Sequence, residues 1–277
     1  LRRRGLDIPV LVVSSLAVEG AEATMKALAA GAADYIPKPD GEGGLGLEAI
    51  ERDLLAKIRA VARRPGAARE DDVVQALSRA PGQTKAPIRL VAVGASTGGV
   101  EALTVFLGGL SKDFPAPVVV AQHLPAVFTP LFTRRLDRVS PLGARVIEDG
   151  MALDGQKGVF VAPGQRHVFI ARNAQGIVAR LSPDALGHAA APSADLLMDS
   201  AAQALGGRHV LAVLLTGMGE DGAKGAARIH REGGRVYVQD RATSVVWGMP
   251  GSAVRAGAVD AVLPLAGLAR AVTETVP

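Results

Sequence analysis

The chain of 277 residues contains no cysteine, and only 3% of its residues are aromatic. The lack of cysteine excludes disulfide bonds, a thiolate nucleophile and a cysteine-ligated metal site, and it fits a reducing, cytoplasmic compartment. The scarcity of aromatic side chains argues against a surface that stacks on nucleic-acid bases. No apolar run reaches the roughly 18 residues of a membrane-spanning helix, so we expect no membrane insertion.

An excess of charge of one sign is also missing. Lys and Arg number 31 against 27 Asp and Glu, which gives a formal net charge of +4. The excess is spread along the chain, and no block of positive charge stands out beyond residues 2–4. We therefore expect no nucleic-acid partner. With 48% hydrophobic and 21% charged residues, the composition is that of a globular protein and not of a disordered one.

Short apolar runs alternate with helical patterns along the chain, which predicts an α/β protein with a mostly parallel sheet. Residues 1–62 supply two strands and two helices, and two strands are too few for a stable sheet. Residues 63–86 are rich in small and charged residues and predict a linker with one short helix. Residues 87–277 resume the alternation with stronger signals and predict one complete domain.

A stretch of short apolar runs interrupts this alternation between residues 159 and 181. Two of the runs, 167–171 and 177–181, are separated by Asn173-Ala174-Gln175-Gly176, which predicts a hairpin loop. We expect the whole stretch, including a run at 159–162, to form a small antiparallel part. Further along the chain, Ser193 is expected to cap a helix through Ala204.

Three predicted strands end in side chains that can act together. The first strand of the domain delivers Ser96, the second delivers His123, and a later one delivers Met218 and Asp221. Carboxyl ends of parallel strands meet at one edge of a sheet, so these groups are expected to lie together. A serine hydroxyl needs a base to become a nucleophile, and a carboxylate orients that base. The sequence therefore predicts a triad of Ser96, His123 and Asp221.

The turns around these residues suit acyl chemistry. Residues 94–98, Gly-Ala-Ser-Thr-Gly, match the G-x-S-x-G pattern of a nucleophile on a strand-to-helix turn. A helix that starts just after Ser96 offers free N–H groups to an oxyanion, and the same argument applies to the glycine-flanked Met218. A glycine-rich turn can also hold a phosphate, but residues 94–99 fit neither G-x-G-x-x-G nor the Walker pattern.

Each residue also has a structural interpretation when it is taken alone. A lone histidine at a strand end is often structural, and Asp221 alone would cap a helix. The alternative function is therefore a non-catalytic receptor-binding or nucleotide-binding module. His167 is open to a place in the site or on the surface. Two further groups carry no predicted site: His188, His209 and His230 lack the spacing of zinc ligands, and Arg134, Arg135 and Arg138 are expected on a solvated helix face.

The motifs that contain these residues resemble those of the bacterial chemotaxis protein-glutamate methylesterase family. The resemblance runs over essentially all of residues 87–277, and the motifs keep the family's order and spacing. Five segments carry it: Val91-Ala92-Val93-Gly94-Ala95-Ser96-Thr97-Gly98-Gly99, Gln122-His123-Leu124-Pro125, Val161-Ala162-Pro163-Gly164, Leu215-Thr216-Gly217-Met218-Gly219-Glu220-Asp221-Gly222 and Trp247-Gly248-Met249-Pro250.

The resemblance implies a doubly wound, mostly parallel sheet in a Rossmann-like three-layer sandwich, with a small antiparallel hairpin part. It implies Ser96, His123 and Asp221 as the triad, with Met218, Thr97 and Gly217 around the oxyanion and substrate. The substrate would be a glutamate methyl ester on a chemoreceptor, hydrolysed with release of methanol. Deamidation of receptor glutamine is a related activity of some members, and no cofactor or metal is implied.

Residues 1–62 resemble the second half of a flavodoxin-like receiver domain of response regulators. Ser14-Ser15 stand where such domains carry a switch hydroxyl, and Lys38 stands near the phosphoryl site. The half with the phospho-accepting aspartate, which a chemotaxis histidine kinase would phosphorylate, is expected upstream. Asp7 and Asp34 do not take that role. We predict that residues 1–62 are unstable as an isolated unit, because the strand at 8–13 would expose an apolar edge.

Overall fold

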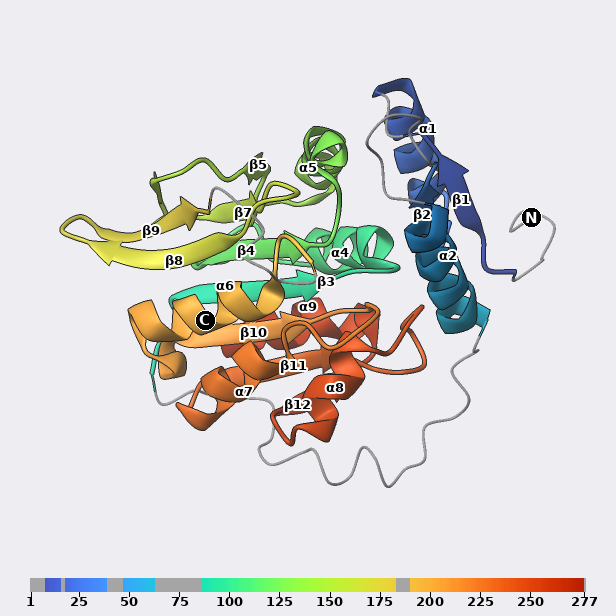
Figure 1. Cartoon of the computed structure of the whole chain (residues 1–277). Coiled ribbons are helices and arrows are strands. Elements are labelled where there is room, and N and C mark those ends of the chain that lie inside the picture. Colours follow the sequence, from blue (N-terminus) through green and yellow to red (C-terminus); the bar gives the residue numbers. More distant parts are fainter. Residues whose placement is uncertain (1–7, 16–17, 39–46, 63–85, 183–189, 277) are drawn as a thin grey trace.

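The computed structural model describes residues 8–15, 18–38, 47–62, 86–182 and 190–276 (Figure 1). The linker predicted for 63–86 lies outside these ranges except for Ala86, and so does His188. Within the described ranges, no helix is long and apolar enough to cross a membrane.

The central element is a sheet of seven parallel strands, as the alternating pattern predicts. The middle strand is β3 (Leu90–Ala95). It pairs with β4 (Pro117–Gln122) on one side and with β10 (Val210–Leu214) on the other, so the strand order reverses at β3. Ligands of open α/β sheets bind at such a switch point. In spatial order the strands are β12 (Ala261–Leu263), β11 (Arg235–Gln239), β10 (Val210–Leu214), β3 (Leu90–Ala95), β4 (Pro117–Gln122), β7 (Gly158–Val161) and β5 (Ala144–Val146).

Helices cover both faces of this sheet (Figure 1). The strands supply a side chain to each face in turn: Val91 and Val93 of β3 belong to one buried cluster, and Leu90 and Ala92 to the other. One face carries α4 (Gly99–Gly108), α5 (Thr129–Val139) and α9 (Leu265–Thr275). The opposite face carries α6 (Ala194–Leu205), α7 (Ala223–Arg231) and α8 (Met249–Arg255). The doubly wound three-layer fold is thereby confirmed.

A small antiparallel sheet stands beside the main one and is formed by β6 (Met151–Ala152), β9 (Gly176–Leu181) and β8 (Val168–Asn173). The predicted hairpin is confirmed, because Asn173 pairs with Gly176. The prediction that 159–162 belongs to this part is wrong: β7 pairs in parallel with β4 and β5. A strand of four buried residues has no alternation that could reveal its partner.

The N-terminal segment, defined here as the described residues of 8–62, contains β1 (Leu11–Ser14), α1 (Val18–Ala29), β2 (Asp34–Pro37) and α2 (Leu47–Ala62). Its two strands pair in parallel. Val13 of β1 is 54% exposed, as expected for an apolar strand edge. On the other side, Met25 and Leu28 of α1 join the same buried cluster as Phe128. The segment therefore packs against the main body beside α4 and α5 (Figure 1).

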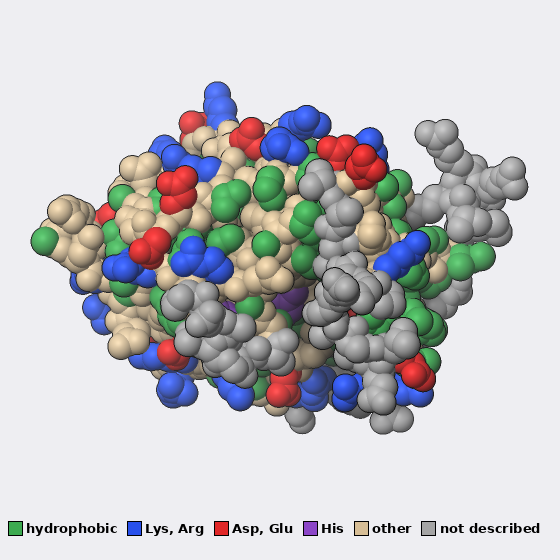
Figure 2. Space-filling model, turned by 45° about the horizontal axis from the view of Figure 1, so that its top comes forward, with side chains coloured by type: hydrophobic (Ala, Val, Ile, Leu, Met, Phe, Trp, Pro, Cys, Tyr) green, Lys and Arg blue, Asp and Glu red, His purple; other side chains and the backbone are tan. Residues whose placement is uncertain are grey.

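Charges of both signs are mixed over the surface. Figure 2 shows Lys and Arg side chains interspersed with Asp and Glu on the face that it presents. Several surface charges form ion pairs, such as Arg180 with Asp149 at 2.8 Å and Arg89 with Asp154 at 2.7 Å. Pairs of this kind are solvent-screened and contribute little stability.

Candidate active site

Ser96 lies in the turn that follows β3 and leads into α4. Its N–H donates to Thr216 O at 3.1 Å, which ties the turn to the end of β10. Its carbonyl oxygen accepts the Gly99 N–H at 2.7 Å and the Nε2 of Gln122 at 3.0 Å. A Cβ at Gly99 would overlap the Gln122 amide, so glycine is required here for the amide to approach. These contacts fix the backbone that carries the Ser96 hydroxyl.

His123 directly follows β4, and its N–H donates to Ala95 O at 3.1 Å. The imidazole is 16% exposed, and its Nε2 lies 2.8 Å from Oδ2 of Asp221. Asp221 comes from the turn between β10 and α7. The sheet therefore brings two side chains into contact that are 98 positions apart in the chain.

The Asp221 carboxylate accepts four hydrogen bonds within the described residues. Oδ2 accepts from His123 and from the Ala194 N–H, at 2.8 and 2.7 Å. Oδ1 accepts from Ser193 Oγ and from the Asp195 N–H, at 2.8 and 3.0 Å. Burial disfavours the charge, but the hydrogen bond and charge of His123 and these backbone amides outweigh it and lower the pKa of Asp221 to about 2. The carboxylate is thus ionised at neutral pH.

Ser96, His123 and Asp221 all line one cavity of about 880 Å³. Within the described ranges, no direct hydrogen bond joins the Ser96 hydroxyl to His123. The bond to Asp221 uses Nε2, so Nδ1 is the ring nitrogen left to accept a proton. Catalytic hydrogen bonds often shorten only when substrate binds.

Met218 and Thr97 line the same cavity, and Gly217 does not. Among the described residues, the backbone N–H groups of Thr97 and Met218 donate to no protein acceptor. The Gly217 N–H, by contrast, donates to Val246 O at 2.9 Å. Two amides beside Ser96 are therefore open to a ligand, whereas Gly217 contributes backbone that packs against Ser96.

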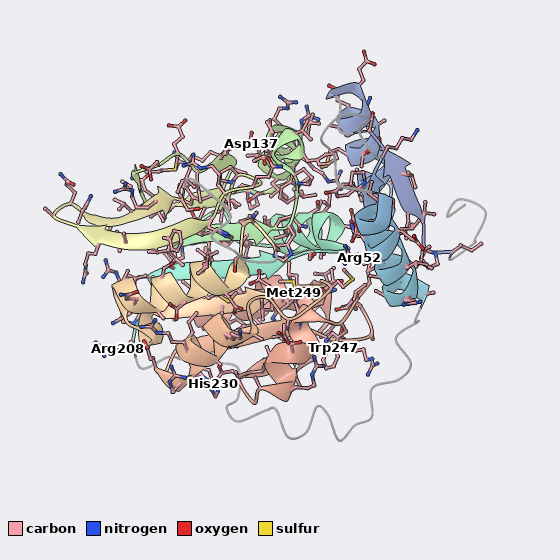
Figure 3. The ribbon with its side chains drawn as sticks, viewed as in Figure 1. Arg52, Asp137, Arg208, His230, Trp247 and Met249 are labelled. Carbon is pink, nitrogen blue, oxygen red and sulfur yellow. The ribbon has the colours of Figure 1, made fainter. Side chains whose placement is uncertain are left out.

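The Trp247–Pro250 motif supports this turn from the start of α8 (Figure 3). The carbonyl oxygen of Gly217 accepts the N–H groups of Gly248 and Met249, both at 3.0 Å. Trp247 donates its indole N–H to Gln239 O at 2.8 Å, which anchors the motif to the end of β11. This motif was recognised by resemblance, and its contacts show that it sets the backbone before Met218.

The N-terminal segment forms one wall of the cavity. Asp34 Oδ2 accepts the Thr97 hydroxyl at 2.6 Å, and both side chains are buried. Next to this contact, Ala33 O accepts the Gly98 N–H at 3.0 Å. Lys57 lies 3.4 Å from Asp34 Oδ2 and also donates to Tyr35 O at 2.8 Å. The segment therefore contacts the residue that follows the predicted nucleophile.

Sequence reasoning missed two residues that shape this site, Gln122 and Asp195, and left the place of His167 open. Gln122 carries no catalytic signature, and its contacts with Ser96 appear only when β3 and β4 pair. His167 is fully buried, and its Nδ1 accepts the Ser193 N–H at 3.1 Å, so the surface alternative for this residue is wrong. Asp195 also lines the cavity. The only signal in the sequence was Ser193 followed by Asp195 at the start of a predicted helix. This pattern does not show which distant residues the two side chains contact.

A sequence profile described as CheB methylesterase matches residues 91–272, a range that contains every residue of the site just described except those of the N-terminal segment. The chain belongs to the CheB methylesterase family. Relatives of this family member include the protein-glutamate methylesterase/protein-glutamine glutaminase 3 of Rhodospirillum rubrum, which is 41% identical over 94% of this chain and 75% of its own. The protein-glutamate methylesterase/protein-glutamine glutaminase 2 of Pseudomonas aeruginosa is 41% identical over 96% of this chain and 75% of its own length.

Similarity to a solved structure agrees with this assignment. The CheB methylesterase catalytic domain of Thermotoga maritima superposes with a TM-score of 0.65 at 36% sequence identity. The match covers 68% of this family member and 99% of the Thermotoga chain.

Proposed function

We propose that this CheB methylesterase family member hydrolyses γ-methyl esters of glutamate side chains on chemoreceptors. The observation that carries the proposal is the His123–Asp221 contact, which lies in the same cavity as a serine on a G-x-S-x-G turn. A histidine bound to a half-buried, ionised carboxylate is a competent general base for a serine hydroxyl. The family and its named relatives point to the same chemistry.

The proposed reaction has two steps. Ser96 Oγ attacks the ester carbonyl carbon while Nδ1 of His123 takes its proton, and the resulting imidazolium is stabilised by Asp221. The tetrahedral oxyanion accepts hydrogen bonds from the open N–H groups of Thr97 and Met218. His123 then returns the proton to the departing methoxide, which leaves as methanol. In the second step His123 deprotonates a water, whose oxygen attacks the acyl carbon; the bond to Ser96 Oγ breaks, His123 returns the proton to that oxygen, and free Ser96 and the glutamate side chain are released.

The same machinery supports deamidation of receptor glutamine. Attack on the amide carbonyl gives the same acyl-serine, and His123 protonates the departing amide nitrogen, which leaves as ammonia. We therefore propose glutaminase activity for this chain as well, as the names of its relatives state for them.

The division of the chain follows from the same proposal. Residues 87–277 form the catalytic domain, residues 63–86 a linker, and residues 1–62 the second half of a receiver domain. A chemotaxis histidine kinase is the proposed partner of a complete receiver. Receptor, kinase and esterase would meet in the cytoplasm.

The decisive test is methanol release from methylated chemoreceptor by wild-type protein and by Ser96→Ala. We expect at least a roughly 1000-fold loss in the variant, the size of effect seen when a triad member is removed. Ser111→Ala, in the loop before β4, is the matched control and should keep the wild-type rate. Equal rates for Ser96→Ala and wild type would refute the assignment of the nucleophile.

A further inference from the structure

The two helices that begin beside the catalytic cavity exchange carboxylates. Asp221 stands two residues before α7, yet its carboxylate accepts the N–H groups of the first two residues of α6, Ala194 and Asp195. Asp195 stands in the first turn of α6, yet its Oδ1 accepts the Gly225 N–H of α7 at 2.8 Å. Each helix start is thus capped by an acid from the other element.

Close packing makes this exchange possible. A Cβ at Gly225 would lie 2.6 Å from Met198 Cβ and 2.8 Å from Asp195 O, so no larger residue fits between the helices. The free N–H groups and positive dipole of each helix start then face the carboxylate from the other. A shift of either helix would loosen both caps, because they share this single contact zone.

The same zone occupies most of the acceptor sites of Asp221. A carboxylate has about four lone-pair positions, and three of the four bonds that Asp221 accepts come from residues 193–195. Ser193 Oγ also accepts the Leu196 N–H at 3.3 Å, while buried His167 accepts the Ser193 N–H. The rotation of the carboxylate toward His123 is therefore set by where α6 begins.

We propose that Asp195 is a positioning residue for the hydrolysis assigned above: by tying the start of α6 to α7, it fixes the orientation of Asp221 toward His123. The proposal rests on the proposed function. Asp195 also lines the cavity beside Asp221. Burial, together with the nearby charge of Asp221, raises the pKa of Asp195.

A matched pair of variants separates this role from ordinary packing. Asp199, one turn further along α6, ties the same two helices by an ion pair with Arg228 at 2.8 Å, but it lies outside the cavity. Asp195→Ala should lower kcat for methanol release by roughly 10- to 100-fold, the loss seen when a residue that orients a metal ligand is removed. KM should change less. Asp199→Ala should stay within about twofold of wild type.

Asp195→Asn separates the hydrogen bond of Asp195 from its charge. The amide oxygen still accepts the Gly225 N–H, but the negative charge is gone. Because the tie between the two helices is kept, Asp195→Asn should restore kcat to within about threefold of wild type, in contrast to Asp195→Ala. Other charged groups around the cavity remain in all variants: Asp34, Asp53, Lys57, Glu220 and Lys224.

The outcomes are distinct. A folded Asp195→Ala with wild-type kcat, or equal losses in Asp195→Ala and Asp199→Ala, overturns the proposal. If Asp195→Ala does not fold, kcat of the folded Asp195→Asn decides alone, and a loss of about tenfold or more in that variant overturns the proposal. Failure of the wild-type protein to release methanol refutes the proposed function instead.

Discussion

Replacing Asp34 by alanine should raise the rate of receptor demethylation, because this side chain joins the N-terminal segment to the catalytic cavity. The carboxylate accepts the Thr97 hydroxyl at 2.6 Å and lies 3.4 Å from Lys57. A receptor helix about 10 Å across must reach Ser96 past this wall of the cavity. Weakening the contact should therefore increase the fraction of molecules that admit substrate.

The size of the effect follows from the kind of bond. A buried hydrogen bond to a charged group contributes about 1.5–3 kcal/mol, and Thr97 and Asp34 are only 2% and 9% exposed. Loss of that free energy shifts the equilibrium between docked and undocked segment by roughly ten- to a hundredfold. The rate rises by the same factor until most molecules are undocked. Lys57 keeps a partner in Asp53 at 3.3 Å, so the variant leaves no isolated buried charge.

The assay compares methanol release from methylated receptor with hydrolysis of a small soluble methyl ester. Asp34→Ala should accelerate the first much more than the second, because a small ester needs no displacement of the segment. Glu51→Ala, on the exposed side of α2, is the control and should change neither rate. Unchanged or slower receptor demethylation by folded Asp34→Ala would refute the reasoning.

Three further predictions concern the body of the site. Gly164→Ala should cost about 1–3 kcal/mol in urea unfolding and slow methanol release, because a Cβ there would overlap Leu124 O and lie 2.5 Å from Ala126 N, in the loop after His123. The low pKa of Asp221 adds to the free energy of unfolding, fully above about pH 4 and less and less as the pH falls toward 2. An acid titration of stability should show a loss of about 2 kcal/mol over this range, and Asp221→Asn should not show it. Common nucleotides should leave the melting temperature unchanged, whereas a nucleotide-binding module would be stabilised by them.

Strand ends were the most informative feature of the sequence. Ser96, His123 and Asp221 each follow an apolar run, and parallel strands deliver such residues to one edge whatever their neighbours are. The cap of α6 by Ser193 was equally local, and it is confirmed by the bond that its hydroxyl accepts from Leu196 N–H. Local patterns of this kind depend only on residues within a few positions of each other.

Features that depend on distant neighbours were not predictable. Asp221 was considered as a cap for the helix that follows it, but it caps α6 instead, because the packing of α6 on α7 decides which amides it faces. The helix α9 was not predicted. The residue before it, Pro264, has no side chain that could cap the helix, and only four residues of α9 are buried. The strand β5 has only three half-buried or exposed residues, and its pairing with β7 defines it.

The place of β3 between β4 and β10 also has a consequence for synthesis of the protein. One neighbour of β3 comes from the chain just after it, and the other is made more than a hundred residues later. A nascent chain that ends before β10 has an unpaired inner strand edge and lacks Asp221. Such chains must keep the apolar edge of β3 covered by other means while they wait. Hydrolytic capacity can therefore arise only after β10 and Asp221 have been made, when β10 pairs with the strand of the main sheet that was made first.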